Sequence, residues 1–358
     1  MTQLTADIRT EPEAMPSLLT QKGGGFTGDR LLALAARGAA FLIILMLVSL
    51  VAVLSKAAWP AFQEYGVKFV TGSQWRPNPL PGPPQRDAAG HVMRDEDGEP
   101  IMTEIPPVFG ALPVIYGTAV SSAIGLAFAI PLSLGAALFL IRIAPRWLAG
   151  PVSFLIEFLA AIPSLAYGIW GVFMLVPFLQ RYLEPALAKI CGAVPGLRWV
   201  VQNADGSPMA YYGRDMLCGG LVLGIMVLPI ITAVSRDVLA AVPVAQIEGT
   251  LALGATWWQS AKEMLRYSKS GLFGAVMLGL ARAAGETMAV TMVIGNSMKI
   301  SPSPLAPSQT MASLLANQFV EAADTHRAAL EAVALLLLIM SLAFNIVARY
   351  LVVGRGKK

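Results

Sequence analysis

An arginine and a glutamate lie four residues apart inside a long apolar stretch. Between Gly271 and Ile294, Arg282 and Glu286 are the only charged residues. On a helix, side chains at this spacing share one face and lie about one turn apart, so the two charges are expected to pair. Arg282 follows Lys269 by 13 residues, a distance of about 20 Å along a helix. If the stretch crosses a bilayer, Arg282 lies deep within it.

The chemistry of this pair has two interpretations. A charge at that depth costs several kcal/mol, so Arg282 is expected to face the bundle interior or water. In one interpretation, Arg282 and Glu286 only neutralise each other. In the other, the planar guanidinium, which suits phosphate or carboxylate oxygens, lies on the path of an oxyanion substrate.

A second group of residues predicts a helix, a tight turn and another helix. Gly254 can close a helix that begins at about Val244, because glycine adopts a left-handed conformation freely. Thr256 and Gln259 have the spacing of a capping box that opens the next helix. This segment is either a simple helical hairpin at the membrane interface or a docking element.

Composition places both groups in a membrane protein. Charged residues make up 13% of the 358 residues and hydrophobic residues 56%, whereas soluble proteins carry about 25% charged residues. So few charges exclude an ordinary soluble enzyme. The net charge of +4 is what positive cytoplasmic flanks would give, and no nucleic-acid partner is expected.

Runs of apolar residues predict six membrane-spanning helices, since about 20 residues cross the hydrocarbon core. Five of the runs carry no charge over most of their length, and the remaining run holds the Arg282–Glu286 pair. The predicted spans are Gly38–Ser55, Ile105–Ile141, Phe158–Gln180, Met216–Ser235, Gly271–Ile294 and Ala332–Ala348. Pro163 and Gly168 interrupt the third span, as is typical of helices whose backbone lines a cavity.

Charge placement predicts cytoplasmic N- and C-termini. In this orientation the cytoplasmic segments hold 14 Lys and Arg against 7 Asp and Glu, and the outer segments hold 11 against 13. This is the asymmetry of the positive-inside rule. No cleavable signal is visible, so the first span is expected to be an uncleaved anchor. The predicted organisation is a cytoplasmic tail (1–27), a six-helix domain (28–353) with a periplasmic loop (55–110) and a cytoplasmic loop (235–270), and a basic tail (354–358).

Other residues carry less chemistry. The outer segment 76–107 is rich in Pro, Gly and acids and is expected to be an insertion without a core of its own. His91 and His326 are isolated and expected to be solvated. Cys191 and Cys218 either form one bridge or remain free thiols. Their spacing is not that of a metal site.

The segment around Glu248 resembles the EAA signature of ABC importer permeases, in which a Glu is followed by two small residues and, six positions after the Glu, by Gly. Glu248 and Gly254 fit this signature, and Gly249 and Thr250 replace its two alanines. The Leu-Pro that follows in the signature is absent. The resemblance implies that Glu248, Gly249, Gly254, Ala255 and Thr256 form a loop that couples the permease to an ATPase.

Longer motifs make the chain similar to the PstC-type permease family of phosphate ABC importers over about residues 28–353. The motifs that carry this resemblance are Gly28-Asp29, Ala58–Gly66, Phe109–Thr118, Glu157–Ser164 and Gly285–Val290. The outer segments 76–105 and 185–213 depart most from the family pattern.

The resemblance implies an all-α integral membrane protein with six transmembrane helices in the type I ABC importer permease arrangement, in the cell inner membrane. It implies pairing with a homologous PstA-type permease, two PstB-type ATPase subunits and a PstS-type periplasmic phosphate-binding protein. The sequence has no Gly-x-x-x-x-Gly-Lys-Ser/Thr loop, so ATP and Mg are expected on the partner ATPase. The chain itself is expected to be neither an enzyme nor a cofactor-binding protein.

Three alternatives differ in class or substrate. An ABC permease for sulfate or a phosphonate would use the same arginine. An ion-coupled symporter would use Glu286 as a titrating carboxylate, but the sequence shows no inverted repeats. A membrane-embedded enzyme would need a nucleophile or metal cluster, for which the sequence offers no motif.

Overall fold

The computed structural model describes residues 28–86, 92–95, 98–202, 206–207 and 209–355. The predicted N-terminal tail, residues 1–27, and His91 lie outside these residues. The first helix, α1, runs from Gly28 to Tyr65. Its residues up to Val53 belong to one compact unit and the residues from Leu54 onward belong to a second. In the first unit the apolar side chains of α1 are exposed, as is expected of a helix surrounded by lipid or by another chain.

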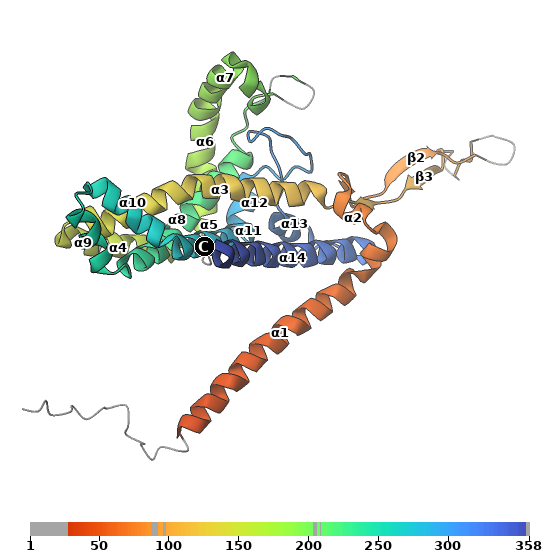
Figure 1. Cartoon of the computed structure of the whole chain (residues 1–358). Helices are drawn as coiled ribbons and strands as arrows, with labels where there is room; N and C mark the ends of the chain where they lie inside the picture. Colours follow the sequence, from red (N-terminus) through yellow and green to blue (C-terminus); the bar gives the residue numbers. More distant parts are fainter. Residues whose placement is uncertain (1–27, 87–91, 96–97, 203–205, 208, 356–358) are drawn as a thin grey trace, which may run out of the picture. The chain divides into compact units, whose positions relative to one another are not determined.

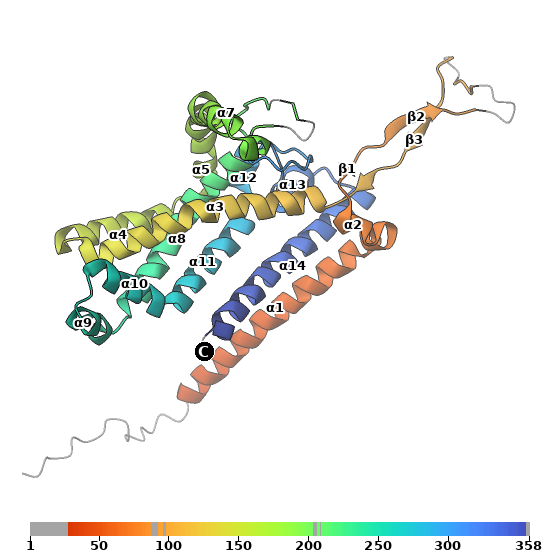
Figure 2. The same ribbon diagram turned by 45° about the horizontal axis from the view of Figure 1, so that its top comes forward.

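The second unit is a helical bundle built around α3 and α8, which lie side by side in Figures 1 and 2. Helix α3 spans Leu112–Leu138 and α8 spans Met216–Ala240. Glycines allow their close approach: a Cβ on Gly125 would lie 2.9 Å from the carbonyl oxygen of Gly220, and one on Gly224 would lie 2.8 Å from that of Gly125. Small residues hold helices together in this way in lipid, where packing replaces the hydrophobic effect.

Two further helices complete the long elements of the bundle. Helix α11 covers Lys269–Ala284 and packs against α8 and α3, and α14 covers Asp324–Arg355 and packs against α11. Because α14 includes Arg355, the first two residues of the predicted C-terminal tail are helical. Cys191 and Cys218 are both buried free thiols, so no disulfide joins them.

The third predicted span is a bent pair of helices, as the position of Pro163 suggested. Gly168 was expected to interrupt the span as well, but it lies within α5. Helix α4 runs from Arg146 to Ala160, and the helical segment that follows begins at Ser164, bent from α4 by 92°. That segment comprises α5 (Ser164–Trp170), α6 (Val176–Phe178) and α7 (Glu184–Ala193), joined by π-helical turns at Gly171–Leu175 and Leu179–Leu183. Another π-helical turn, Phe139–Ile143, ends α3, and a 3-10 turn, Pro195–Val200, follows α7.

The fifth predicted span is interrupted as well, and the prediction of one continuous helix there is wrong. Helix α11 ends at Ala284 and α12 covers Met288–Val293. Within the described residues, four uninterrupted helices are long and apolar enough to cross a bilayer, and the bent pair can provide a fifth crossing. Six crossings are compatible with this architecture, but two of them are built from broken helices.

The two ends of the bundle carry different structures (Figures 1 and 2). One end holds α9 (Val244–Ala252) and α10 (Trp257–Tyr267). The other end holds the antiparallel hairpin of β2 (Leu80–Pro84) and β3 (Met102–Ile105). The predicted cytoplasmic loop and the predicted periplasmic loop therefore lie at opposite ends, and the second forms strands in an otherwise helical chain.

A small aromatic core anchors the hairpin end. There α2 (Lys68–Thr71), the strand pair β1 (Trp75–Arg76) and β4 (Val108–Phe109), and α13 (Met311–Gln318) meet the start of α14. His326 stacks on Phe109, with ring centroids 5.5 Å apart, and makes a 3.1 Å hydrogen bond with Gln318. The Trp75 indole N–H donates to the same Gln318 oxygen. The prediction of a solvated His326 is therefore wrong.

Candidate functional site

Arg282 and Glu286 lie at the interruption between α11 and α12. Arg282 is in the last turn of α11, and Glu286 lies beyond its end, in the three-residue break. The Arg282 Nη2 and Glu286 Oε2 atoms are 3.9 Å apart, so the expected pairing is present at the long limit of an ion pair. The helix that was expected to carry both residues nevertheless ends before Glu286.

Each member of the pair has a different environment. The Glu286 side chain is 6% exposed, whereas the Arg282 side chain is 48% exposed. The other Glu286 oxygen, Oε1, accepts a hydrogen bond of 3.4 Å from the Ala289 N–H in the first turn of α12. Glu286 therefore fastens the start of α12 and faces Arg282, while the guanidinium remains accessible from outside the chain.

The two broken helices pack against each other. A Cβ on Gly168 of α5 would lie 3.0 Å from the Cα of Ala289 and 2.9 Å from the Met292 sulfur, so only glycine permits this approach of α5 to α12. Ile162, in the α4–α5 break, packs on the same core cluster as Ala289. We call α4–α5 and α11–α12 the interrupted helices.

One face of α11 has no covering partner among the described residues. Gly274, Leu278 and Arg282 are exposed and lie at successive intervals of four residues, which is the spacing of one helix face. Leu278 is 52% exposed, as is Met288 at the start of α12. A guanidinium on a lipid-facing surface at this depth would cost several kcal/mol. This face therefore requires either a protein partner or a water-filled path.

The second group of predicted residues forms the α9–α10 hairpin, residues 244–267. Gly254 has a φ of +81°, as expected for the residue that closes α9. The Thr256 side chain accepts from the Gln259 N–H, and the Gln259 side chain accepts from the Thr256 N–H, so the predicted capping box is confirmed. The turn is further held by the Ala255 N–H, which donates to the Thr250 carbonyl.

The outer surface of this hairpin is free to bind a partner. Glu248, Gly249, Gly254 and Thr256 are exposed, and Leu253 at the tip is 90% exposed. The Thr250 hydroxyl lies 3.1 Å from the Ser260 hydroxyl and ties α9 to α10. The turn is therefore a firm, projecting surface with an apolar tip.

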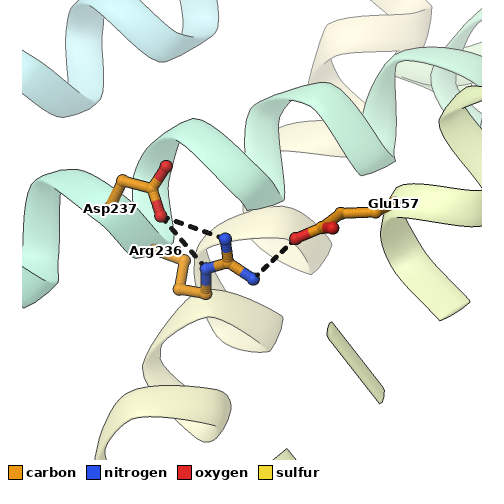
Figure 3. A network of polar contacts seen from close by, with 3 residues as sticks. All are labelled: Glu157, Arg236 and Asp237. Carbon is orange, nitrogen blue, oxygen red and sulfur yellow. Dashed lines mark hydrogen bonds and ion pairs between the residues drawn. The ribbon is translucent and has the colours of Figure 1, made fainter. Parts of the chain in front are cut away.

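An ionic network that the sequence did not suggest lies close to the α9–α10 end. Figure 3 shows Arg236, near the end of α8, between Glu157 of α4 and Asp237. Arg236 Nη1 donates to Glu157 at 3.1 Å, while Nε and Nη2 donate to Asp237 at 3.2 and 3.1 Å. The network fastens α4 to α8 just before the bend. Its only sequence signal is that these three charges lie at the ends of two predicted spans.

The chain is similar to membrane components of known transport systems. Residues 105–354 match the family model described as "Binding-protein-dependent transport system inner membrane component". The chain is 36% identical over 325 residues to the phosphate transport system permease protein PstC of Mesorhizobium japonicum, covering 90% of this chain and 89% of that protein.

Other relatives extend the same similarity. Over 320 residues, the PstC protein of Xylella fastidiosa is 38% identical, covering 88% of this chain and 89% of that protein. The probable PstC protein of Methanocaldococcus jannaschii is 30% identical over 314 residues, covering 87% of this chain and 90% of that protein. A solved structure of the MetNI methionine ABC transporter in an inward-facing conformation matches with a TM-score of 0.45 and 17% identity, covering 68% of this chain and 94% of that one.

Proposed function

Because this chain belongs to the family of binding-protein-dependent transport system inner membrane components, we propose that it is the permease subunit of an ATP-driven importer that moves inorganic phosphate across the inner membrane. The observation that carries the proposal is its similarity to PstC permeases over about nine-tenths of its length. The Arg282 guanidinium, beside the break between α11 and α12, supplies the positive charge and the N–H donors that bind an oxyanion.

Arg282 would stabilise phosphate in transit. The guanidinium is always charged and offers parallel N–H donors that match tetrahedral oxyanions. At 3.9 Å its contact with Glu286 is long, so phosphate, with one to two negative charges, can compete for the same donors. Glu286 is held by α12, and its fixed negative charge would keep Arg282 balanced before phosphate arrives and favour release afterwards.

The uncovered face of α11 supports pairing with a second permease. That face carries Gly274, Leu278 and Arg282, whose small, apolar and charged side chains suit a helix from a homologous PstA-type subunit around a shared path. Such a partner would cover Leu278 and keep Arg282 away from lipid.

The α9–α10 hairpin would couple this permease to ATP hydrolysis. Glu248, Gly249, Gly254, Ala255 and Thr256 would shape a projection that fits a cleft on a PstB-type ATPase, with Leu253 as its apolar tip. ATP and Mg would be bound by two copies of that ATPase. A PstS-type protein would deliver phosphate at the opposite end of the bundle, where the β2–β3 hairpin lies. In this arrangement both termini are cytoplasmic and β2–β3 is periplasmic.

Uptake by a strain that lacks this chain tests the substrate. We expect radiolabelled phosphate uptake to fail without the chain and to return on complementation, while sulfate uptake is unaffected. Restored uptake of sulfate or a phosphonate, without phosphate uptake, would assign the chain to another oxyanion. If uptake continues when the P-loop of the PstB-type ATPase is inactivated, the result would instead favour an ion-coupled symporter.

Reporter fusions test the orientation independently. A reporter placed within residues 80–100 is expected to be periplasmic, and one within 245–260 is expected to be cytoplasmic. A cytoplasmic reporter within 80–100 would reverse the proposed orientation.

A further inference from the structure

A pocket with an apolar wall and a few polar side chains lies at the far end of α12 from Glu286. It has a volume of about 330 Å³ and is lined by Val172, Arg214, Thr291, Met292, Gly295 and Asn296. A water molecule takes up about 30 Å³, so the pocket can admit a tetrahedral oxyanion with several of its waters. None of its six lining residues is acidic, and one is a permanent cation.

The backbone around Arg214 is fixed by its neighbours. Gly213 before it has a φ of +67° and is packed against the Val176 carbonyl, where a Cβ would not fit. Asp215 after it is 1% exposed and caps α8 by accepting a 2.7 Å hydrogen bond from the Cys218 N–H. The Arg214 carbonyl in turn packs against Gly295, which has a φ of +91°. Arg214 therefore projects from a rigid corner.

The opposite wall of the pocket is equally well held. Asn296 adopts a φ of +50°, a left-handed conformation that asparagine tolerates better than most residues. Its Nδ2 donates to the Thr291 carbonyl at 2.8 Å. The Ser308 backbone N–H donates to the Ile294 carbonyl, and the Ser308 carbonyl accepts from the Ser297 N–H. These two bonds hold the backbone on both sides of Asn296. One Asn296 side-chain N–H then remains for a ligand.

The charge of Arg214 has no carboxylate partner within ion-pair distance among the described residues. The neighbouring Asp215 carboxylate is directed into the protein by its cap on α8. Arg214 itself is exposed, so its attraction for an anion is screened by water and the binding is weak. A weak site suits a substrate that must leave again.

The pocket is aligned with the proposed path. Helix α12 has six residues, a length of about 9 Å at helical rise. Glu286 precedes α12, whereas Gly295 and Asn296 of the pocket follow it. The chain leaves the α9–α10 end through α11 and reaches the pocket after α12. The pocket therefore lies toward the end of the bundle that carries the β2–β3 hairpin.

We propose that this pocket, with Arg214 and Asn296 as its donors, is an outer oxyanion subsite that receives substrate before it reaches Arg282. The inference rests on the proposed function and adds a second exposed cation to the path. The two sites would act in sequence: Arg214 draws the anion from the delivering protein, and Arg282 accepts it at the break between α11 and α12.

Transport by the assembled complex in proteoliposomes tests this subsite, with ATP inside, the binding protein outside, and radiolabelled inorganic phosphate as the probe. Loss of an exposed, water-screened charge contact corresponds to a drop of up to about fivefold. We therefore expect Arg214→Gln to lower the maximal uptake rate about fivefold at saturating binding protein. The concentration of binding protein that gives half-maximal uptake should change less than about twofold.

Two further variants keep the test falsifiable. Asn296→Asp preserves the side-chain shape and tolerates the left-handed φ, but it puts a negative charge in the pocket, so uptake should also fall. Lys299→Gln removes an exposed cation three residues beyond the pocket and should transport like wild type. All rates are normalised to complexes that co-elute with the ATPase.

The subsite is overturned if Arg214→Gln transports normally, or if Lys299→Gln falls equally. It is also overturned if a higher concentration of binding protein restores the Arg214→Gln rate, because Arg214 would then dock that protein. A wild-type complex that does not move phosphate would instead refute the proposed function. The same variants would then be assayed with the oxyanion that the complex does move.

Discussion

The α9–α10 hairpin and the interrupted helices are constructed in opposite ways. In the hairpin the contacts that shape the turn join residues close in sequence: Gly254 closes α9, Thr256 caps α10, and Thr250 reaches Ser260 ten residues away. In the interrupted helices the decisive contact joins Gly168 to Ala289, more than a hundred residues apart. The turn between α9 and α10 is therefore shaped by its own residues, whereas the packing of α5 on α12 exists only when the bundle is assembled.

This difference predicts where substitutions act. Hairpin residues such as Glu248 and Leu253 are exposed, so replacing them should alter partner binding and leave the fold intact. Glu286 is buried and holds α12, so its replacement affects structure and passage together. Experiments on the two regions therefore need different controls.

The largest effect is expected at the Arg282–Glu286 pair, at the break between α11 and α12. Arg282→Lys keeps the charge but loses the bidentate geometry, and phosphate uptake should fall about tenfold. The double variant Arg282→Ala/Glu286→Ala removes both charges without leaving either unpaired, and uptake should fall about a hundredfold. Uptake per assembled complex is the measurement.

The double variant separates passage from folding. If it assembles with its partners and does not transport, the pair acts on the substrate. If it transports phosphate like wild type, the pair is only structural and the proposed path is wrong. Arg282→Ala alone cannot decide, because it leaves the buried Glu286 carboxylate without its ion-pair partner.

The same contrast explains what the sequence could predict. Gly254, Thr256 and Gln259 gave the hairpin because glycine closure and capping boxes depend only on neighbours in the chain. The i,i+4 spacing gave the Arg282–Glu286 pair but not the end of α11 at Ala284. Beyond that end α12 packs on α5, a contact with no local signal in the sequence. The pocket at Arg214 was missed for the same reason, since its walls come from three separate segments.

A smaller effect is expected in the hairpin, where two glycines form a matched pair. Gly254 has a φ of +81°, and a β-branched residue at this φ costs about 1–2 kcal/mol. Gly254→Val should therefore produce a chain that is expressed but couples ATP hydrolysis to transport about tenfold less well. Coupling is measured as phosphate moved per ATP hydrolysed.

Gly249 provides the control. An added Cβ there meets no atom within 4 Å, and its φ is not in the left-handed region. Gly249→Ala restores an alanine of the EAA signature and leaves the turn unchanged, so this variant should behave like wild type although Gly249 belongs to the proposed coupling loop. If Gly254→Val couples normally, the turn does not shape the contact with the ATPase. A loss in both variants would point to contact surface rather than turn conformation.

The smallest effect compares the helix caps of the two regions. Asp215 caps α8 from a buried position, whereas Thr256 caps α10 from an exposed one. Burial raises the pKa of Asp215 to about 7, and the neighbouring Glu184 carboxylate adds to the rise, while the hydrogen bond from the Cys218 N–H opposes it. An aspartate in the unfolded chain has a pKa of about 3.9. Between about pH 3.9 and pH 7, the folded state therefore binds the Asp215 proton more tightly than the unfolded state does.

Stability should therefore fall as the pH rises through this window and stay low above it. We expect the purified wild-type complex to unfold at a lower temperature at pH 8 than at pH 6. Asp215→Asn keeps the oxygen that accepts from Cys218 but cannot ionise, so it should reduce this difference. Thr256→Ala loses a cap worth about 1 kcal/mol and should lower Tm equally at both pH values. If Asp215→Asn retains the full wild-type difference, the buried cap is not the titrating group, and the start of α8 is no more sensitive to pH than the exposed hairpin.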